Sequence, residues 1–225
     1  MRSDDINYLG IDRVLKRGTG QIIERSDDAL LVYDTVSGAF FLDCDDCDTG
    51  IAVLNKHEDK GYRLLMTVNE AVAKEAFTRY GFDEMLECYQ VAYFNKAPET
   101  DDGLTYRIAD ENDLDALIAV YDRISPKELS EVVKRRNILL AYDGKSFVGF
   151  MGEHLEGSMG LLYVFPKYRR KGYGAAVEKK FIAMTIEKGF VPFGQVEKDN
   201  EISLRLQEKL GLDKSDKLIF WMWKL

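Results

Sequence analysis

Apolar residues recur in the second half of the chain with two spacings, and their order predicts a series of strands and helices. Residues 104–109 alternate as a short strand, and helical spacing begins after Asp110, which can cap that helix. Ser125 and Pro126 have the pattern of an N-cap followed by a helix-starting proline, so a second helix is expected to run to about Arg136. The further elements expected are two strands joined by an Asp143-Gly144 turn, a strand over 159–165, a helix over 174–188, a strand over 190–196, a helix over 200–210 and a strand over 218–224. The predicted order, βααβββαβαβ, is typical of the α/β class.

One stretch, Asn95 to Gly103, interrupts this apolar pattern. Its sequence NKAPETDDG collects proline, acidic residues and glycine, which is the composition of an exposed linker. We therefore predict a first domain over residues 1–95, a linker over 96–103 and a second domain over 104–225.

The composition, with 46% hydrophobic residues in 225, is that of a globular protein able to bury a large core. The apolar runs fall short of the ~20 residues that a membrane span needs, and the first ten residues, MRSDDINYLG, carry acids where a signal peptide has an apolar core. We therefore expect a cytoplasmic protein with no membrane partner. The net charge of −8 argues against nucleic acid as a partner and favours a cationic one.

Cys44 and Cys47 have the spacing of a metal or redox site. Zinc, however, needs four ligands, and only one further cysteine and two histidines remain in the chain. The aspartates around the pair also oppose thiolate formation. We therefore expect no metal and no structural disulfide, and we expect this segment to end a strand and cap a helix over 49–54.

The stretch from Gly160 to Gly189 combines features of an anion-binding site. A predicted strand ends at Pro166, a basic loop with two glycines follows, and a helical pattern begins directly after it. The first N–H groups of such a helix are unpaired, and glycines let the backbone approach an anion closely. Taken alone, these residues are equally compatible with a basic surface loop before an ordinary helix.

Residues 169–174 fit the pattern Arg/Gln-x-x-Gly-x-Gly/Ala, and they follow a Val-x-Pro strand end at Val164. In this order they resemble the GNAT (GCN-related N-acetyltransferase) superfamily. The resemblance implies an α/β (α+β) fold with a mixed central sheet flanked by helices, and acetyl-CoA as co-substrate. It also implies that Val164 and Phe165 line the pantetheine arm. The residues implied to hold the pyrophosphate are Arg169, Arg170, Lys171, Gly172, Tyr173 and Gly174.

A second motif lies at the expected spacing after the first. The superfamily signature Asn-x-x-Ala/Ser-x-x-Leu-Tyr-x-Lys-x-Gly-Phe resembles the sequence from Asn200 to Leu212. By this resemblance Asn200 and Ser203 belong to the cofactor-binding residues. Gln207 stands where the signature most often has a tyrosine, which is thought to protonate or hydrogen-bond the departing sulfur. Because a carboxamide donates hydrogen bonds but does not titrate near neutrality, Gln207 is expected to assist departure without acting as an acid.

The first piece of the chain shows an internal similarity to the second. Residues 69–94 and 200–225 each contain a helical run, a glycine turn and a long apolar strand, with Gly81 and Gly211 offset by 130 residues. We interpret the first piece as a degenerate copy of the same fold, as in tandem GNAT proteins. The alternative is two unrelated α/β domains with a common helix-turn-strand ending. No glycine-rich loop precedes Asn69, so the first copy is expected not to bind CoA.

Acyl transfer from a thioester to an amine needs a proton acceptor, an oxyanion donor and a route for the sulfur to leave. Backbone N–H groups near Val164 are expected to stabilise the oxyanion. Glu153 is the first choice for the base and Glu156 the second, and the alternative for each is a solvated hairpin carboxylate. Tyr163 and Tyr173 are further side chains that could face the cleft.

The sequence therefore predicts an N-acetyltransferase that moves the acetyl group of acetyl-CoA to a primary amine, either a small molecule or a peptide amine. One alternative is a GNAT-like module that binds CoA without turnover, which the Gln207 departure permits. Another is transfer of a different acyl or aminoacyl group.

Overall fold

The computed structural model describes residues 5–100 and 102–225. Residues 1–4 of the predicted first domain and Asp101 of the predicted linker lie outside the described residues. The contacts divide the chain into two compact units, and each is discontinuous in sequence. Unit 1 comprises Met1–Val91, Gln195–Arg205 and Asp213–Leu225, and unit 2 comprises Ala92–Gly194 and Leu206–Leu212. The division therefore assigns most of the last 31 residues to the first unit, unlike the sequential division expected at residue 95.

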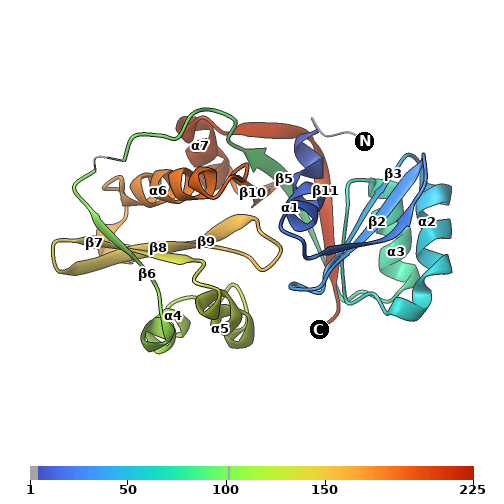
Figure 1. Ribbon diagram of the computed structural model, residues 1–225, viewed down its shortest axis with the longest axis horizontal. Helices are drawn as coiled ribbons and strands as arrows, with labels where there is room; N and C mark the ends of the chain where they lie inside the picture. Colours follow the sequence, from blue (N-terminus) through green and yellow to red (C-terminus); the bar gives the residue numbers. More distant parts are fainter. Residues whose placement is uncertain (1–4, 101) are drawn as a thin grey trace. The chain divides into compact units, whose positions relative to one another are not determined.

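The first part of the chain contains three helices and five strands, with short 3-10 turns between them, among the described residues (Figure 1). Their bounds are η1 Ile6–Tyr8, α1 Leu9–Lys16, β1 Gly20–Arg25, β2 Ala29–Asp34, β3 Phe40–Cys44, α2 Cys47–Lys56, η2 Glu58–Lys60, β4 Leu64–Thr67, α3 Glu70–Arg79 and β5 Glu84–Ala92.

The second part begins with the elements β6 Thr105–Ile108, η3 Glu111–Asp113, α4 Leu114–Ile118, α5 Pro126–Lys134, β7 Ile138–Asp143, β8 Ser146–Glu153 and β9 Met159–Val164. It continues with η4 Pro166–Tyr168, α6 Tyr173–Glu187, β10 Phe193–Glu197, α7 Glu201–Leu210 and β11 Asp213–Trp223. The expected order βααβββαβαβ is confirmed.

In unit 1 the paired strands follow the order β1-β2-β3-β4-β11, with β3 and β4 parallel and the other pairs antiparallel. Alternate residues face opposite sides, as the pleat requires. Phe220 packs with α2 and α3 on one face, whereas Trp221 packs with α1 on the other. Both faces of this sheet are therefore buried, and Trp221 is a core residue.

In unit 2 the order is β10-β9-β8-β7-β6, and the β9–β10 pair is parallel. Helices α4 and α5 cover one face with a core that includes Leu117, Leu129 and Phe150. Helix α6 lies on the opposite face, against β7, β8 and β9 (Figure 1). The protein thus has the expected α/β architecture, with mixed strands flanked by helices. No helix of the described residues is long and apolar enough to cross a membrane.

Candidate active site

Strand β9 leaves its parallel neighbour almost at once. Among the described residues, β9 pairs with β10 at the single position Met159–Gly194, while its pairing with β8 continues to Val164. Beyond Met159, β9 therefore continues without further pairing to β10 among the described residues. A strand that has parted from a parallel neighbour offers unpaired backbone groups to an extended ligand.

A β-bulge interrupts β9 midway. Phe150 and Gly152 of β8 pair with Tyr163 and Gly160, so β9 has one more residue than β8 between these positions. Leu161 lies in this extra stretch with a φ of +54°, in the left-handed region. A bulge leaves a backbone N–H out of the ladder, where it can donate to an oxyanion.

Glycines make room for the bulge, because a Cβ would meet neighbouring atoms too closely. At Gly149 it would lie 2.3 Å from the Tyr163 carbonyl oxygen, and at Gly160 it would lie 2.4 Å from His154 Nε2. The bulge was not predicted from the sequence, although glycines inside the predicted strands were a usable signal for it.

The basic loop after β9 has the backbone of an anion site. Arg170 has a φ of +60° and Gly172 one of +86°, so the chain curls twice before α6 begins. The first helical hydrogen bond found is from Ala176 N to Gly172 O, at 3.0 Å. The N–H groups of residues 173–175 therefore precede the helical ladder, and they lie where the positive end of the helix dipole adds to their attraction for an anion.

Three side chains of this loop contact neighbouring groups. Arg169 Nε donates to the Val164 carbonyl oxygen at 2.9 Å, which ties the loop to the end of β9. The Tyr173 hydroxyl donates to Asp143 Oδ2 at 2.5 Å, and this bond raises the Tyr173 pKa. Lys171 lies over the Tyr168 ring, with its Nζ 5.7 Å from the ring centroid. The loop is therefore held to both β7 and β9.

A cavity of about 280 Å³ opens beside the start of α6 within unit 2. Its lining combines Gly172 and Lys179 with Lys209 from the end of α7. The other lining residues are Glu99, Asp102, Ala175, Ala176 and Leu210. The two lysines and the helix N-terminus suit this cavity to a phosphate-bearing ligand.

The two carboxylates expected as bases are buried, since Glu153 is 7% and Glu156 8% exposed. The Ser158 hydroxyl donates to Glu156, and His154 Nδ1 lies 3.8 Å from Glu128 on α5. Burial lowers the His154 pKa, but the nearby Glu128 carboxylate and the charges of Glu156 and Glu153 outweigh it, so the pKa is raised. The burial of Glu153 and Glu156 argues against the alternative that they are solvated hairpin carboxylates. His154 is a partnered residue of this acidic cluster.

A further buried carboxyl group, which was not predicted from the sequence, is Glu178 on α6, at 2% exposed. Gln207 on α7 is also buried, at 6% exposed. Burial raises the Glu178 pKa to about 7, and the Gln207 side chain opposes this rise. Glu178 Oε2 and Gln207 Oε1 have no hydrogen-bond partner among the described residues.

The structure gives Asn200 a capping role in unit 1, since its Oδ1 accepts from Ser203 N at 3.1 Å at the start of α7. Both residues therefore belong to a different compact unit from the loop over 169–174. Their contribution to cofactor binding stays a prediction.

The Cys44 and Cys47 segment has the structural role that was expected. Asp46 caps α2 by accepting from Thr49 N at 2.8 Å. Burial, reinforced by the charge of Asp43, raises the Cys44 pKa to about 12, so this thiol is neutral. Within residues 5–100 and 102–225, no group of three or more histidine, cysteine or acidic side chains is placed to hold a metal ion.

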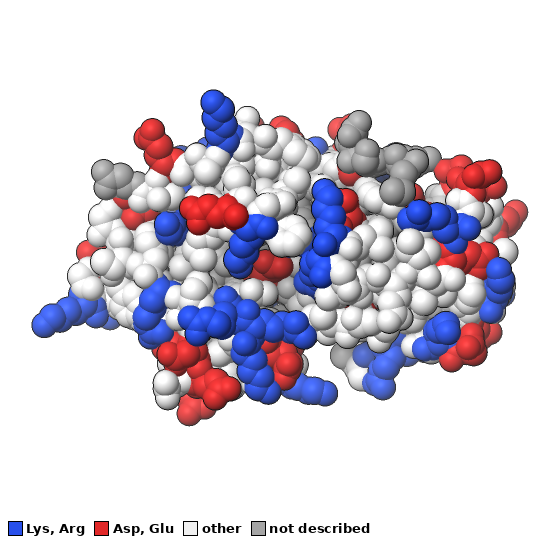
Figure 2. Space-filling model, viewed as in Figure 1, with Lys and Arg blue, Asp and Glu red and all other residues white. Residues whose placement is uncertain are grey.

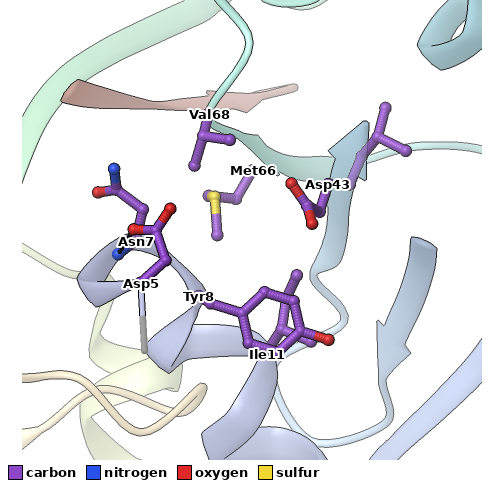
Figure 3. A pocket seen from close by; sticks show the side chains of 8 residues that line it. Asp5, Asn7, Tyr8, Ile11, Asp43, Met66 and Val68 are labelled. Atoms are coloured by element: carbon purple, nitrogen blue, oxygen red, sulfur yellow. Dashed lines mark hydrogen bonds between the residues drawn. The ribbon is translucent and has the colours of Figure 1, made fainter. Parts of the chain in front are cut away.

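A small hollow in unit 1 is lined by Asn7 and Tyr8 at the start of the chain, Asp43 on β3 and Met66 on β4 (Figure 3). Asn7 Oδ1 and the Tyr8 hydroxyl have no partner among the described residues. Its volume of about 10 Å³ is comparable to one water molecule, so it is no site for an acyl substrate.

Charges of both signs share the face of unit 2 shown in Figure 2. Basic side chains gather over α5 and acidic ones over the neighbouring α4. The basic loop after β9 is therefore one local feature of a mixed surface.

Comparisons with known proteins agree with this geometry. Residues 142–221 match the model of the family described as FR47-like protein. A solved Drosophila melanogaster protein is 14% identical, with a TM-score of 0.65 and coverage of 100% of this chain and 97% of its own. A GCN5-related N-acetyltransferase-like protein from Streptococcus suis is 17% identical, with a TM-score of 0.57 and coverage of 96% and 92%. A GCN5-related N-acetyltransferase from Kribbella flavida is 12% identical, with a TM-score of 0.56 and coverage of 97% and 94%.

No curated protein matches the chain. The family model covers 80 residues, from β7 through the bulge, the basic loop and α7 to β11. The solved structures extend the likeness over almost the whole chain. The protein therefore has the fold of the GNAT acetyltransferases.

Proposed function

We propose that the protein is an N-acetyltransferase that transfers the acetyl group of acetyl-CoA to a primary amine by direct attack. The observation that carries this proposal is the course of β9. A loop with unpaired N–H groups that suit an anion follows the C-terminal end of the strand. Buried carboxylates precede its N-terminal end, and a bulge lies between the two ends. Its six residues span roughly 20 Å, enough to pair with an extended pantetheine arm.

The loop over 169–174 is the proposed pyrophosphate site. Its support is the three N–H groups that precede the α6 ladder and the left-handed Gly172. The cavity with Lys179 and Lys209 would take a further phosphate of the nucleotide. Val164 and Phe165, at the end of β9, would line the arm between phosphates and thioester.

Glu153 is proposed as the base that takes the proton of the attacking amine, and Glu156 as the substitute. The acidic cluster with His154 favours a cationic acceptor, which must lose a proton before it attacks. Backbone N–H groups between the bulge and Val164 would stabilise the oxyanion. Gln207 would donate a hydrogen bond to the sulfur, which needs only modest help because a thiol has an ordinary pKa of about 8.5.

A combined binding and turnover experiment tests the proposal. Calorimetry with acetyl-CoA measures binding, and release of free CoA is then assayed with a panel of small amines and peptides. Binding with acceptor-dependent CoA release is expected. Binding without release by any acceptor would favour a CoA-holding module, whereas turnover with longer acyl-CoA or aminoacyl-tRNA would identify another donor.

We also propose that the N-terminal piece of the chain is a degenerate copy of the fold that binds no CoA. Its support is the matching succession of α3, Gly81 and β5 with α7, Gly211 and β11, in which both glycines have positive φ.

A further inference from the structure

His154 lies against β9 at the point where this strand parts from β10. Beyond Met159 the two strands share no further pair among the described residues, and Gly160 is the first residue after that point. A Cβ on Gly160 would lie 2.4 Å from His154 Nε2, so the imidazole ring packs directly on the glycine backbone. The next residue, Leu161, lies in the bulge. His154 Nε2 is therefore beside the backbone that is proposed to stabilise the oxyanion.

The backbone around His154 holds the ring in this place. His154 N donates to Ser158 O at 2.8 Å, and Gly157 N donates to His154 O at 2.9 Å. These two bonds close the turn between β8 and β9, in which Gly157 has a φ of +104°. A side chain that must meet a reacting atom benefits from such a rigid support. The His154 side chain is still 29% exposed, so a ligand can reach it.

The two ring nitrogens of His154 have different surroundings. Nδ1 lies 3.8 Å from Glu128 Oε1, in the first turn of α5. No hydrogen bond to Nε2 is found among the described residues. In a neutral imidazole one nitrogen carries the proton and the other accepts, and a nearby carboxylate favours the proton on the nitrogen that faces it. Glu128 therefore favours the tautomer in which Nε2 has an available lone pair beside Gly160.

The ring and the proposed CoA loop are reached from opposite faces of the strands. Glu128 belongs to α5, which packs with α4 on one face, whereas α6 covers the other (Figure 1). Val164 points toward the α6 face, since a Cβ on Gly174 would lie 3.8 Å from its Cγ2. A ligand can therefore meet His154 from the α5 face while the start of α6 holds CoA.

We propose that His154 contacts the amine substrate: its Nε2 accepts a hydrogen bond from the attacking primary amine, and Glu128 holds the ring in the tautomer that permits this. This inference rests on the acyl transfer proposed above. A primary amine has two N–H groups, so one can donate to Nε2 while the other loses its proton to Glu153. The amine nitrogen becomes positive as its bond to the acyl carbon forms, which strengthens the hydrogen bond to Nε2 in the transition state. The carbon–sulfur bond then breaks, and His154 keeps its own single proton throughout.

The charges around the ring set the pH at which this contact exists. The carboxylates that act on the imidazole belong to Glu128 on α5, Glu156 in the turn and Glu153 at the end of β8, and together they raise the His154 pKa. A protonated ring has no acceptor at Nε2. The contact therefore forms as pH rises through the His154 pKa, and pH 9 suits its tests.

The first test observes the tautomer of His154 without turnover. The chain has two histidines, so nitrogen-15 NMR at pH 9 needs only His57→Gln to assign the imidazole signals. We expect the His154 proton on Nδ1, and mixed tautomers in Glu128→Leu. The Nε2 signal should shift when saturating CoA is added together with the amine that releases CoA fastest in the panel above. A proton on Nε2, the same tautomer in Glu128→Leu, or an Nε2 signal that does not respond to the amine would overturn the inference.

The second test replaces each ring nitrogen separately, at pH 9 and saturating acetyl-CoA with the same amine. The amide of glutamine reaches the place of Nε2, whereas that of asparagine reaches only the place of Nδ1. His154→Asn should lower kcat/KM for the amine about tenfold, the effect of one hydrogen bond, and His154→Gln should keep most of it. The KM for acetyl-CoA should change little in both, and His57→Asn is the matched control. Equal losses in the two His154 variants, or a matching rise in the KM for acetyl-CoA, would indicate a structural role and overturn the contact.

The substitution Gly160→Ala displaces the imidazole without removing it, because its Cβ would occupy the space next to Nε2. It should lower kcat/KM for the amine about tenfold, like His154→Asn. In a His154→Ala background the same substitution should cost little more, since the ring is then absent. Fully additive losses would mean that Gly160 acts apart from His154, and they would count against the contact.

These outcomes distinguish the contact from acyl transfer itself. If the wild type transfers the acetyl group but His154→Asn and His154→Gln behave alike, only the contact is overturned and acyl transfer stands. If the wild type binds CoA but transfers to no amine, acyl transfer fails, and the contact with an attacking amine fails with it.

Discussion

The buried acid on α6 predicts an unusual dependence of stability on pH, and the substitution Glu178→Gln isolates it. In the folded protein burial raises the Glu178 pKa from its ordinary 4.5 to about 7. Between these two values the folded state keeps a proton that the unfolded state has lost. The free energy of unfolding therefore falls as pH rises through this window, and the loss is complete above the folded pKa.

The magnitude follows from the size of the shift. A rise from 4.5 to about 7 corresponds to roughly 3 kcal/mol, at 1.36 kcal/mol for each pKa unit. The neutral glutamine carries no such penalty at any pH. Relative to the wild type, Glu178→Gln should therefore gain stability by up to roughly 3 kcal/mol between pH 4.5 and 8.

Urea unfolding at half-unit steps from pH 4.5 to 8.5 measures the difference, together with the thermal midpoint, which shifts by about 2–4 °C for each kcal/mol in a chain of this size. The control Glu187→Gln removes an exposed carboxylate from the same helix and should give a nearly flat difference. Parallel curves for wild type and Glu178→Gln across this range would refute the reasoning, because they would mean that residue 178 ionises alike in both states.

Three further predictions concern the proposed site. Gly174→Asp should fold but bind CoA weakly or not at all, as measured by calorimetry. Gly174→Ala tests steric tolerance, because a Cβ there would meet only Val164 Cγ2 at 3.8 Å. If the Asp variant binds CoA with wild-type affinity, the assignment of the loop loses its basis. Titration should find one CoA site per chain, and two equivalent sites would contradict the degenerate-copy proposal. At saturating acetyl-CoA, Gln207→Leu should lower the rate about tenfold and Glu153→Gln about 10²-fold or more; an unchanged rate in Glu153→Gln from pH 6 to 9 would transfer the base role to Glu156.

Local patterns explain why the order of elements could be predicted. The Asp143-Gly144 turn joins β7 and β8 as expected, because Gly144 supplies the positive φ that the tight hairpin requires. Ser125 caps α5 by accepting from Glu128 N at 3.1 Å, as its position before a proline indicates. Such signals involve residues within four positions of each other, so the sequence displays them directly.

Features that depend on residues far apart in the chain were harder to predict from the sequence. Strand β11 begins at Asp213, five residues before the predicted start at 218. Its first residues are polar, so they show no apolar alternation, and they belong to the strand because it pairs with its neighbours in the sheet. Its later residues pair with β4, as in Trp221 with Met66, more than 150 positions earlier in the chain. Glu178 lies beside two lysines in the sequence, which is the pattern of an exposed helix residue, yet it is 2% exposed in the folded protein.

The two helix ends that the internal comparison aligned show how a copy could lose its chemistry. Phe82 N donates to Phe77 O at 3.1 Å after α3, and Leu212 N donates to Gln207 O at 3.0 Å after α7, so both turns close over five residues around a left-handed glycine. This alignment keeps the offset of 130 residues and puts Phe77 opposite Gln207. A phenylalanine has no donor for a departing sulfur. If the N-terminal piece is a copy, it therefore lacks the thiol donor as well as the glycine-rich loop, and both changes agree with a unit that supports the fold without catalysing transfer.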